Sequence, residues 1–184
     1  AALAGVGVLT LGATLAGMPG VPTPEASVNV GWVQPGAPGG GVYGLGPPRT
    51  IAFNAQAETA RLMARVRAGE EPEPAFLVWP ENSTDMDPRE DTLTLQAVQS
   101  AVAYAGRGVL VGSIYSDDAR EERQTVALWW DVHGADLVYA KRNLVPFGEW
   151  IPFRELLLPL IPELAYVGYQ SVPGTTPGTF PVTL

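Results

Sequence analysis

Apolar and polar positions along the chain follow two alternating patterns, one typical of strands and one typical of helices. Short runs rich in β-branched and aromatic residues, bounded by Gly and Pro, predict strands. The predicted strands cover residues 27–33, 75–79, 109–115, 125–132, 137–140 and 179–184. His133 and Gly134 lie between two of these runs and predict a hairpin turn, with His133 on the surface.

Helices are predicted at residues 50–68 and 93–104, where apolar side chains recur every three or four positions. The side chains expected to face inward are Phe53, Ala57, Ala60, Met63 and Val66 in the first helix, and Leu93, Ala97, Val98, Ala101 and Tyr104 in the second. Gly106 and Gly108 are expected to end the second helix. A shorter helix, interrupted by two prolines, is expected at 156–164.

The order strand, helix, strand, helix, strand, strand predicts an α/β domain whose sheet carries helices on one face. The Gly- and Pro-rich segment 34–49 is expected to be a loop, because its glycine spacing matches neither a dinucleotide fingerprint nor a Walker loop.

Residues 1–18 contain no charged side chain and are all apolar or small. A helix that spans a bilayer needs roughly 20 such residues, so we interpret this run as the end of a transmembrane helix. A buried Gly-rich core helix and a signal-peptide remnant are the alternatives. Residues 1–24 would then be this helix and a linker, and residues 25–184 the soluble domain.

The composition of the chain argues against several classes of function. The net charge of −8 argues against nucleic acid, which binds basic surfaces. The chain has no Cys and a single His, which leaves few ligands for a transition metal and none for a disulfide.

Two charged residues stand where predicted strands end. Trp79-Pro80-Glu81 takes an apolar strand directly into a carboxylate, at the kind of strand end where open α/β sheets bind ligands. A partly buried Glu there could act as a general base, whereas the plainer interpretation is a loop residue that caps a turn. Lys141 follows a later strand and could stabilise an oxyanion, or simply extend into solvent.

An acidic stretch follows Glu81 and contains Asp85, Asp87, Glu90 and Asp91. We interpret it mainly as a solvated loop, with a cation site as the alternative.

Two motifs of this chain together resemble the paired motifs of apolipoprotein N-acyltransferases, a branch of the nitrilase superfamily. The first is Trp79-Pro80-Glu81, and the second is the segment 141–149, which starts at Lys141 and ends in Leu-Val-Pro-Phe-Gly-Glu. The resemblance covers residues 28–184. It implies a nitrilase-like αββα sandwich, of which this chain is a part, and a Glu–Lys–Cys triad. Glu81 matches the general base, Lys141 the oxyanion-stabilising lysine and Glu149 a supporting glutamate.

The resemblance also implies a nucleophilic Cys, which is expected beyond Leu184, so the chain alone should be inactive. The implied reaction moves an acyl chain from a phospholipid, through a Cys thioester, to the amine of a diacylglyceryl-cysteine lipoprotein. This reaction calls for no metal or organic cofactor. The implied location is the bacterial cell membrane, with the catalytic domain on its extracytoplasmic side. A soluble carbon–nitrogen hydrolase and a non-catalytic nitrilase-like binding module are the alternatives.

Aromatic residues are frequent in the Pro-rich segment after Lys141. They are Phe147, Trp150, Phe153, Tyr166 and Tyr169. Because Trp and Tyr favour the membrane interface, this segment could form a lid that rests on lipid; ordinary packing over the sheet is the alternative.

Overall fold

A computed structural model describes residues 27–39 and 46–182. Its centre is a mixed sheet in which β1 to β5 lie in chain order, and β6 pairs with β4. The strands are β1 (Val30–Trp32), β2 (Phe76–Trp79), β3 (Val109–Asp117), β4 (Glu122–Asp131), β5 (Gly134–Ala140) and β6 (Gln170–Ser171). The first three strands are parallel, and the β3–β4 and β4–β5 pairs are antiparallel. The predicted mixed α/β arrangement is therefore confirmed.

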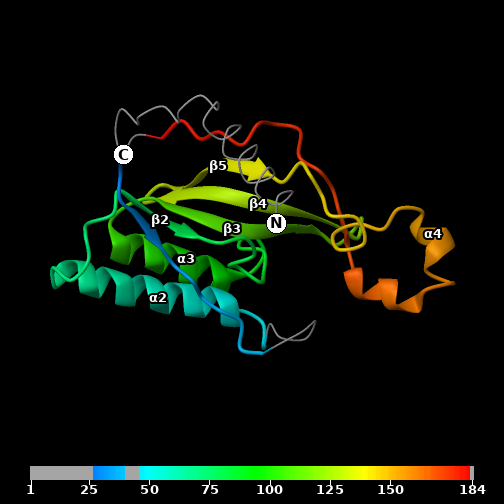
Figure 1. Cartoon of the computed structure of the whole chain (residues 1–184), viewed down its shortest axis with the longest axis horizontal. Helices are drawn as coiled ribbons and strands as arrows, with labels where there is room; N and C mark the ends of the chain where they lie inside the picture. The colour runs from blue at the N-terminus through cyan, green and yellow to red at the C-terminus, as the bar shows by residue number, and fades with distance from the viewer. Residues whose placement is uncertain (1–26, 40–45, 183–184) are drawn as a thin grey trace, which may run out of the picture.

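Two long helices, α2 (Thr50–Arg67) and α3 (Thr92–Ala105), pack side by side on one face of the sheet (Figure 1). The predicted one-sided helical cover is thus confirmed. Asp91 caps the start of α3, because its carboxylate accepts a hydrogen bond from the Thr94 N–H at 2.8 Å. Gly106 ends α3 in the left-handed conformation, with φ 69°, as its position in the sequence predicts.

The buried face of α2 matches the predicted one at Met63 but differs from it at Phe53 and Ala57. Phe53 and Ala57 are exposed, and the buried residues are Ile51, Ala52, Ala55, Thr59 and Met63. The buried Thr59 hydroxyl accepts a hydrogen bond from the Trp79 indole N–H and donates one to the Ala55 carbonyl, both at 2.9 Å, so its polar group is satisfied in the core. A polar residue thus occupies a core position that a count of apolar residues misses.

In α3 the prediction is right at Ala97, Val98 and Ala101 but wrong at the ends, because Leu93 and Tyr104 are 48% and 42% exposed. The core that the helices cover is formed by alternate side chains of the strands, as period-two burial requires. Leu77 and Trp79 of β2 stand beside Val109 and Val111 of β3, and all four side chains are at most 1% exposed.

The predicted hairpin joins β4 to β5, but its turn lies at Val132 and His133, one residue earlier than predicted. His133 is exposed, as predicted. The expected helix at 156–164 appears as two short pieces, α4 (Arg154–Leu157) and the 3₁₀ helix η1 (Pro162–Val167), which project beyond the end of the sheet (Figure 1). The strand expected from residue 179 is absent at 179–182, the described part of that range. The chain adds β6 instead, which the sequence pattern did not indicate.

The predicted transmembrane helix at residues 1–18 lies outside the described residues, as does the predicted boundary near residue 25. Within the described ranges, no helix combines the length and the apolar character needed to cross a membrane.

Candidate active site

Glu81 stands directly beyond the carboxyl end of β2, where Pro80 ends the strand. The neighbouring position on β3 is Gly112, and the backbone of Pro80 and Glu81 passes close over it. A Cβ atom at Gly112 would lie 2.0 Å from the Pro80 carbonyl oxygen, so only glycine fits. The absence of a side chain at Gly112 therefore fixes how closely Glu81 approaches β3.

Lys141 follows the last residue of β5, and its backbone is held on both sides. Its N–H donates to the Thr125 carbonyl of β4 at 2.8 Å, and its carbonyl accepts from the Gly174 N–H at 2.9 Å. Because β5 is antiparallel to β4, which is itself antiparallel to β3, β5 runs in the direction of β2 and β3. The carboxyl ends of β2 and β5 therefore lie at the same edge of the sheet, which brings together two residues far apart in sequence.

The Lys141 ammonium lies between two carboxylates at this edge. Its Nζ is 3.1 Å from Glu81 Oε1 and 3.1 Å from Glu149 Oε1. The side chains of Lys141 and Glu149 are 27% and 13% exposed, whereas that of Glu81 is 54% exposed. The three residues singled out from the sequence are thus assembled into one cluster, with Glu81 on its accessible side.

Glu149 is the most enclosed member and is held from several directions. Its Oε2 accepts a hydrogen bond from the Val145 N–H at 2.7 Å, and its Oε1 lies 3.5 Å from the Thr125 hydroxyl. Its carbonyl accepts from the Ser171 N–H of β6 at 2.8 Å. These contacts turn the segment 145–149 back towards Lys141.

The opposite charges of Lys141 and its two glutamate neighbours stabilise the ionised form of Lys141 and of Glu149. Burial alone would lower the pKa of Lys141, but hydrogen bonds and attraction from Glu149 and Glu81 outweigh it, so this pKa is raised. Burial alone would raise the pKa of Glu149, but the Val145 N–H and the Lys141 ammonium outweigh it, so this pKa is lowered. Lys141 is therefore a fixed cation at neutral pH, suited to stabilising negative charge rather than to taking up a proton.

Comparison with curated proteins places this arrangement in context. The chain is 31% identical over 159 residues to an apolipoprotein N-acyltransferase from Mycolicibacterium smegmatis (strain ATCC 700084 / mc(2)155), a match that covers 84% of this chain and 27% of that protein. This chain is a homologue of apolipoprotein N-acyltransferases over part of their length. An apolipoprotein N-acyltransferase from Vibrio cholerae serotype O1 is 33% identical over 92 residues, which cover 47% of this chain and 18% of that protein. The chain thus spans about a quarter or less of these N-acyltransferases.

Among solved structures, a double mutant of the amidase from Nesterenkonia sp. AN1, in complex with acrylamide, shares the fold with a TM-score of 0.50. It is 14% identical, and the match covers 84% of this chain and 52% of the amidase. This amidase is a member of the nitrilase superfamily, and the likeness concerns the mixed α/β fold alone. No family model matches the sequence.

The acidic stretch after Glu81 is solvated only in part, because Glu90 is exposed whereas Asp87 and Asp91 are largely buried, which corrects the interpretation made from the sequence. The Asp87 side chain is 4% exposed and pairs with Arg89, and the Asp91 side chain is 12% exposed and pairs with Arg49. No group of acidic or His residues able to hold a metal ion occurs in the described part of the chain. Arg89, two residues after Asp87, was the only local signal for one of these ion pairs, whereas the partner of Asp91 is Arg49, which lies far away in the sequence.

The segment that resembles the N-acyltransferase motif beyond Glu149 presents large apolar side chains to solvent. Phe147, Phe153 and Tyr166 are 52%, 82% and 66% exposed, and Trp150 is 36% exposed. Leu156 and Leu160, on the projecting part of the chain around α4, are 67% and 71% exposed. The exposure of Phe153 therefore does not fit packing over the sheet, which was the alternative to a lid that rests on lipid.

Proposed function

We propose that this chain is part of the catalytic domain of an apolipoprotein N-acyltransferase and carries two of the three residues of its catalytic triad. The observation that carries the proposal is the Lys141 ammonium, held 3.1 Å from both Glu81 and Glu149 at the carboxyl edge of the sheet. Homology to N-acyltransferases over 84% of the chain supports it. The nucleophilic thiol must come from elsewhere in the protein, because these 184 residues contain no Cys.

The geometry suggests a division of roles among the three charged residues. Glu81 is accessible and is the general base that takes the proton from the thiol. Lys141 has three N–H donors, and its contacts with the two glutamates use two of them, so we assign the third to the oxyanion. Glu149 is enclosed, accepts the Val145 N–H, and acts as the support that keeps the ammonium in place.

The first half-reaction forms an acyl-enzyme. The thiol gives its proton to Glu81, and the thiolate attacks the ester carbonyl carbon of a phospholipid, which forms a C–S bond and an oxyanion next to Lys141. Collapse of this intermediate breaks the ester C–O bond, and the proton on Glu81 passes to the departing lysophospholipid. An acyl thioester remains on the enzyme.

The second half-reaction transfers the acyl chain. The α-amine of a diacylglyceryl-cysteine lipoprotein attacks the thioester carbonyl, and the same cation stabilises the second oxyanion. A C–N bond forms, the C–S bond breaks, and one amine proton returns through Glu81 to the thiolate. The products are an N-acylated lipoprotein and free enzyme, and no metal or organic cofactor takes part.

We place the protein at the bacterial cell membrane, with this domain on the extracytoplasmic side and with a second layer of the αββα sandwich supplied by the rest of the protein. The exposed aromatics Phe147, Trp150 and Phe153 suit contact with lipid, since the interfacial zone favours such rings. Replacing Trp150 by Ala should then slow the reaction with phospholipid in vesicles. An unchanged rate with vesicles would count against the lipid contact.

The direct test is to trap the acyl-enzyme. The full-length protein is incubated with phospholipid but no lipoprotein acceptor, and its intact mass is measured. We expect the mass of one acyl chain to be added in the wild type and lost in Glu81→Gln. The matched control is Glu73→Gln, which alters an exposed glutamate paired with Arg107 away from the site and should leave the adduct unchanged.

A folded, Cys-containing protein that forms no adduct would overturn the proposal. Hydrolysis of small amides by that protein would then establish the soluble carbon–nitrogen hydrolase instead. Failure of both reactions would leave the non-catalytic binding module.

A further inference from the structure

The residues after Glu81 form a tight turn that determines where its carboxylate points. The Ser83 N–H donates to the Pro80 carbonyl at 3.2 Å, so Glu81 and Asn82 occupy the centre of a β-turn. Asn82 has a left-handed backbone, with φ 55°, and a positive φ at the third residue is typical of a type II turn. The direction of Glu81 therefore depends on how firmly both ends of this turn are held.

The far end of the turn is attached to β3 by hydrogen bonds. The Ser83 N–H and hydroxyl both donate to the Gly112 carbonyl, at 2.9 and 2.7 Å. The Thr84 and Ser113 hydroxyls are 2.6 Å apart, and both residues are fully buried. The loop thus begins by following β3 residue by residue.

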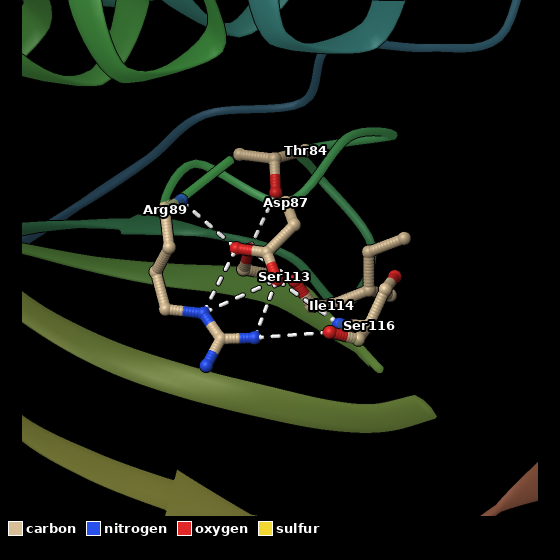
Figure 2. A network of polar contacts seen from close by, with 6 residues as sticks. All are labelled: Thr84, Asp87, Arg89, Ser113, Ile114 and Ser116. Carbon is tan, nitrogen blue, oxygen red and sulfur yellow. Dashed lines mark hydrogen bonds and ion pairs between the residues drawn. The ribbon is translucent and has the colours of Figure 1, made fainter. Parts of the chain in front are cut away.

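Asp87 makes the next attachment, at the end of the same strand (Figure 2). Its Oδ2 accepts hydrogen bonds from the Ser116 N–H at 3.0 Å and from Arg89 Nη2 at 2.6 Å. Its Oδ1 accepts from the Arg89 N–H at 2.8 Å and from Arg89 Nε at 3.1 Å. The Arg89 guanidinium in turn lies 3.6 Å from the centre of the Tyr115 ring.

A buried carboxylate is costly unless it is fully paired, and its low tolerance for misalignment makes it a precise constraint on the backbone around it. Asp87 satisfies this condition, because a backbone N–H from β3 and three N–H groups of Arg89 surround its oxygens. Asp87 and Ser83 therefore fasten the two ends of the short segment that follows Glu81 to a single strand.

We propose that Asp87 is a positioning residue for Glu81, which holds the turn 80–83 against β3 and so keeps the Glu81 carboxylate in reach of Lys141. This inference rests on the proposed function, in which Glu81 is the general base. Asp87 touches no reacting group and acts only through the backbone. A displacement of about 1 Å in a catalytic group can lower the rate on the order of a hundredfold.

The test is the Asp87→Asn variant of the full-length protein. The amide keeps the size of the side chain but presents N–H groups to the N–H groups of Arg89. The clamp, which is the set of hydrogen bonds from Asp87 to Arg89 and to the Ser116 N–H, therefore weakens. We expect kcat for acyl transfer, per folded molecule, to fall by about ten- to a hundredfold, with KM for phospholipid within about twofold of the wild type. The matched control, Asp117→Asn, removes an exposed acid that pairs with Arg120 at 3.5 Å on the same strand, and should change neither constant.

An unchanged kcat in Asp87→Asn would overturn the inference. So would a fall in rate that only follows the loss of folded protein, measured by circular dichroism on the same sample. If Asp87→Asn does not fold, Arg89→Lys replaces it with the same criteria, because lysine keeps the charge but cannot make the paired contacts. Full activity in Glu81→Gln, or no acyl adduct in the wild type, would refute the proposed function itself, which separates the two failures.

Discussion

Gly112 offers a sharp test of how the structure positions Glu81. In Gly112→Ala the new Cβ would lie 2.0 Å from the Pro80 carbonyl oxygen and 2.7 Å from the Glu81 Cα. A comfortable carbon–oxygen contact is about 3.4 Å, so β3 and the segment at Glu81 must separate by roughly 1.4 Å. Such overpacking typically costs about 1–3 kcal/mol of stability. A shift of this size at a catalytic group should also lower acyl transfer on the order of a hundredfold.

The assay is the rate of acyl-thioester formation in full-length protein, measured below the unfolding transition. Gly108→Ala is the matched control, because its Cβ would lie 2.2 Å from the Trp129 ring, just before the start of the same strand and away from Glu81. We expect both variants to lose thermal stability, but only Gly112→Ala to lose rate per folded molecule. A Gly112→Ala protein with the wild-type rate, or a Gly108→Ala protein equally slowed, would refute the positioning argument.

Two further predictions concern stability and pH. Thr59→Val leaves the buried Trp79 indole N–H without its 2.9 Å partner and should lower the free energy of unfolding, measured in denaturant, by about 1–3 kcal/mol. Thr59→Ser should lower it less, and an unchanged stability in Thr59→Val would contradict this prediction. Hydrogen bonds from Arg49 hold the pKa of Asp91 well below its ordinary 3.8, so the folded state gives up this proton more readily than the unfolded state. The stabilisation is present above pH 3.8 and is lost as the pH falls through the lower folded pKa. The gap in melting temperature between wild type and Asp91→Asn, which keeps the helix cap, should therefore close on acidification; a constant gap from pH 7 to strong acid would argue against it.

The helices and strands were predictable because buried positions recur with a regular period in each element, and apolar residues in the sequence follow that period. The end of an element was also predictable from the sequence where a single residue determines it, as Gly106 does at the end of α3. The buried face of α2 was predictable only in part, because the buried Thr59 is polar and hydrogen-bonds to Trp79, and Phe53 is exposed although it is apolar. Burial at such positions depends on neighbours that the local sequence does not contain.

The same distinction applies to charge. The sequence suggested Glu81, Lys141 and Glu149 through their motifs, and these motifs were sufficient to indicate a family. It gave a wrong account of Asp87, whose paired burial depends on the backbone of β3 and on the stacking of Arg89 over Tyr115. A charged residue looks solvated in any sequence until its partners are known.

The sequence by itself determined the order and type of the main elements and the identity of the charged residues at two strand ends. These follow from periodicity and from side-chain chemistry, which are local properties. Only the tertiary structure decided that Lys141 lies between Glu81 and Glu149, because this requires two changes of strand direction to return β5 parallel to β2. Only the structure revealed the close approach of the Pro80–Glu81 backbone to Gly112 and the hydrogen bonds that hold Asp87 to β3. Both are contacts between segments that are distant in the sequence, and the sequence does not show which distant segments meet.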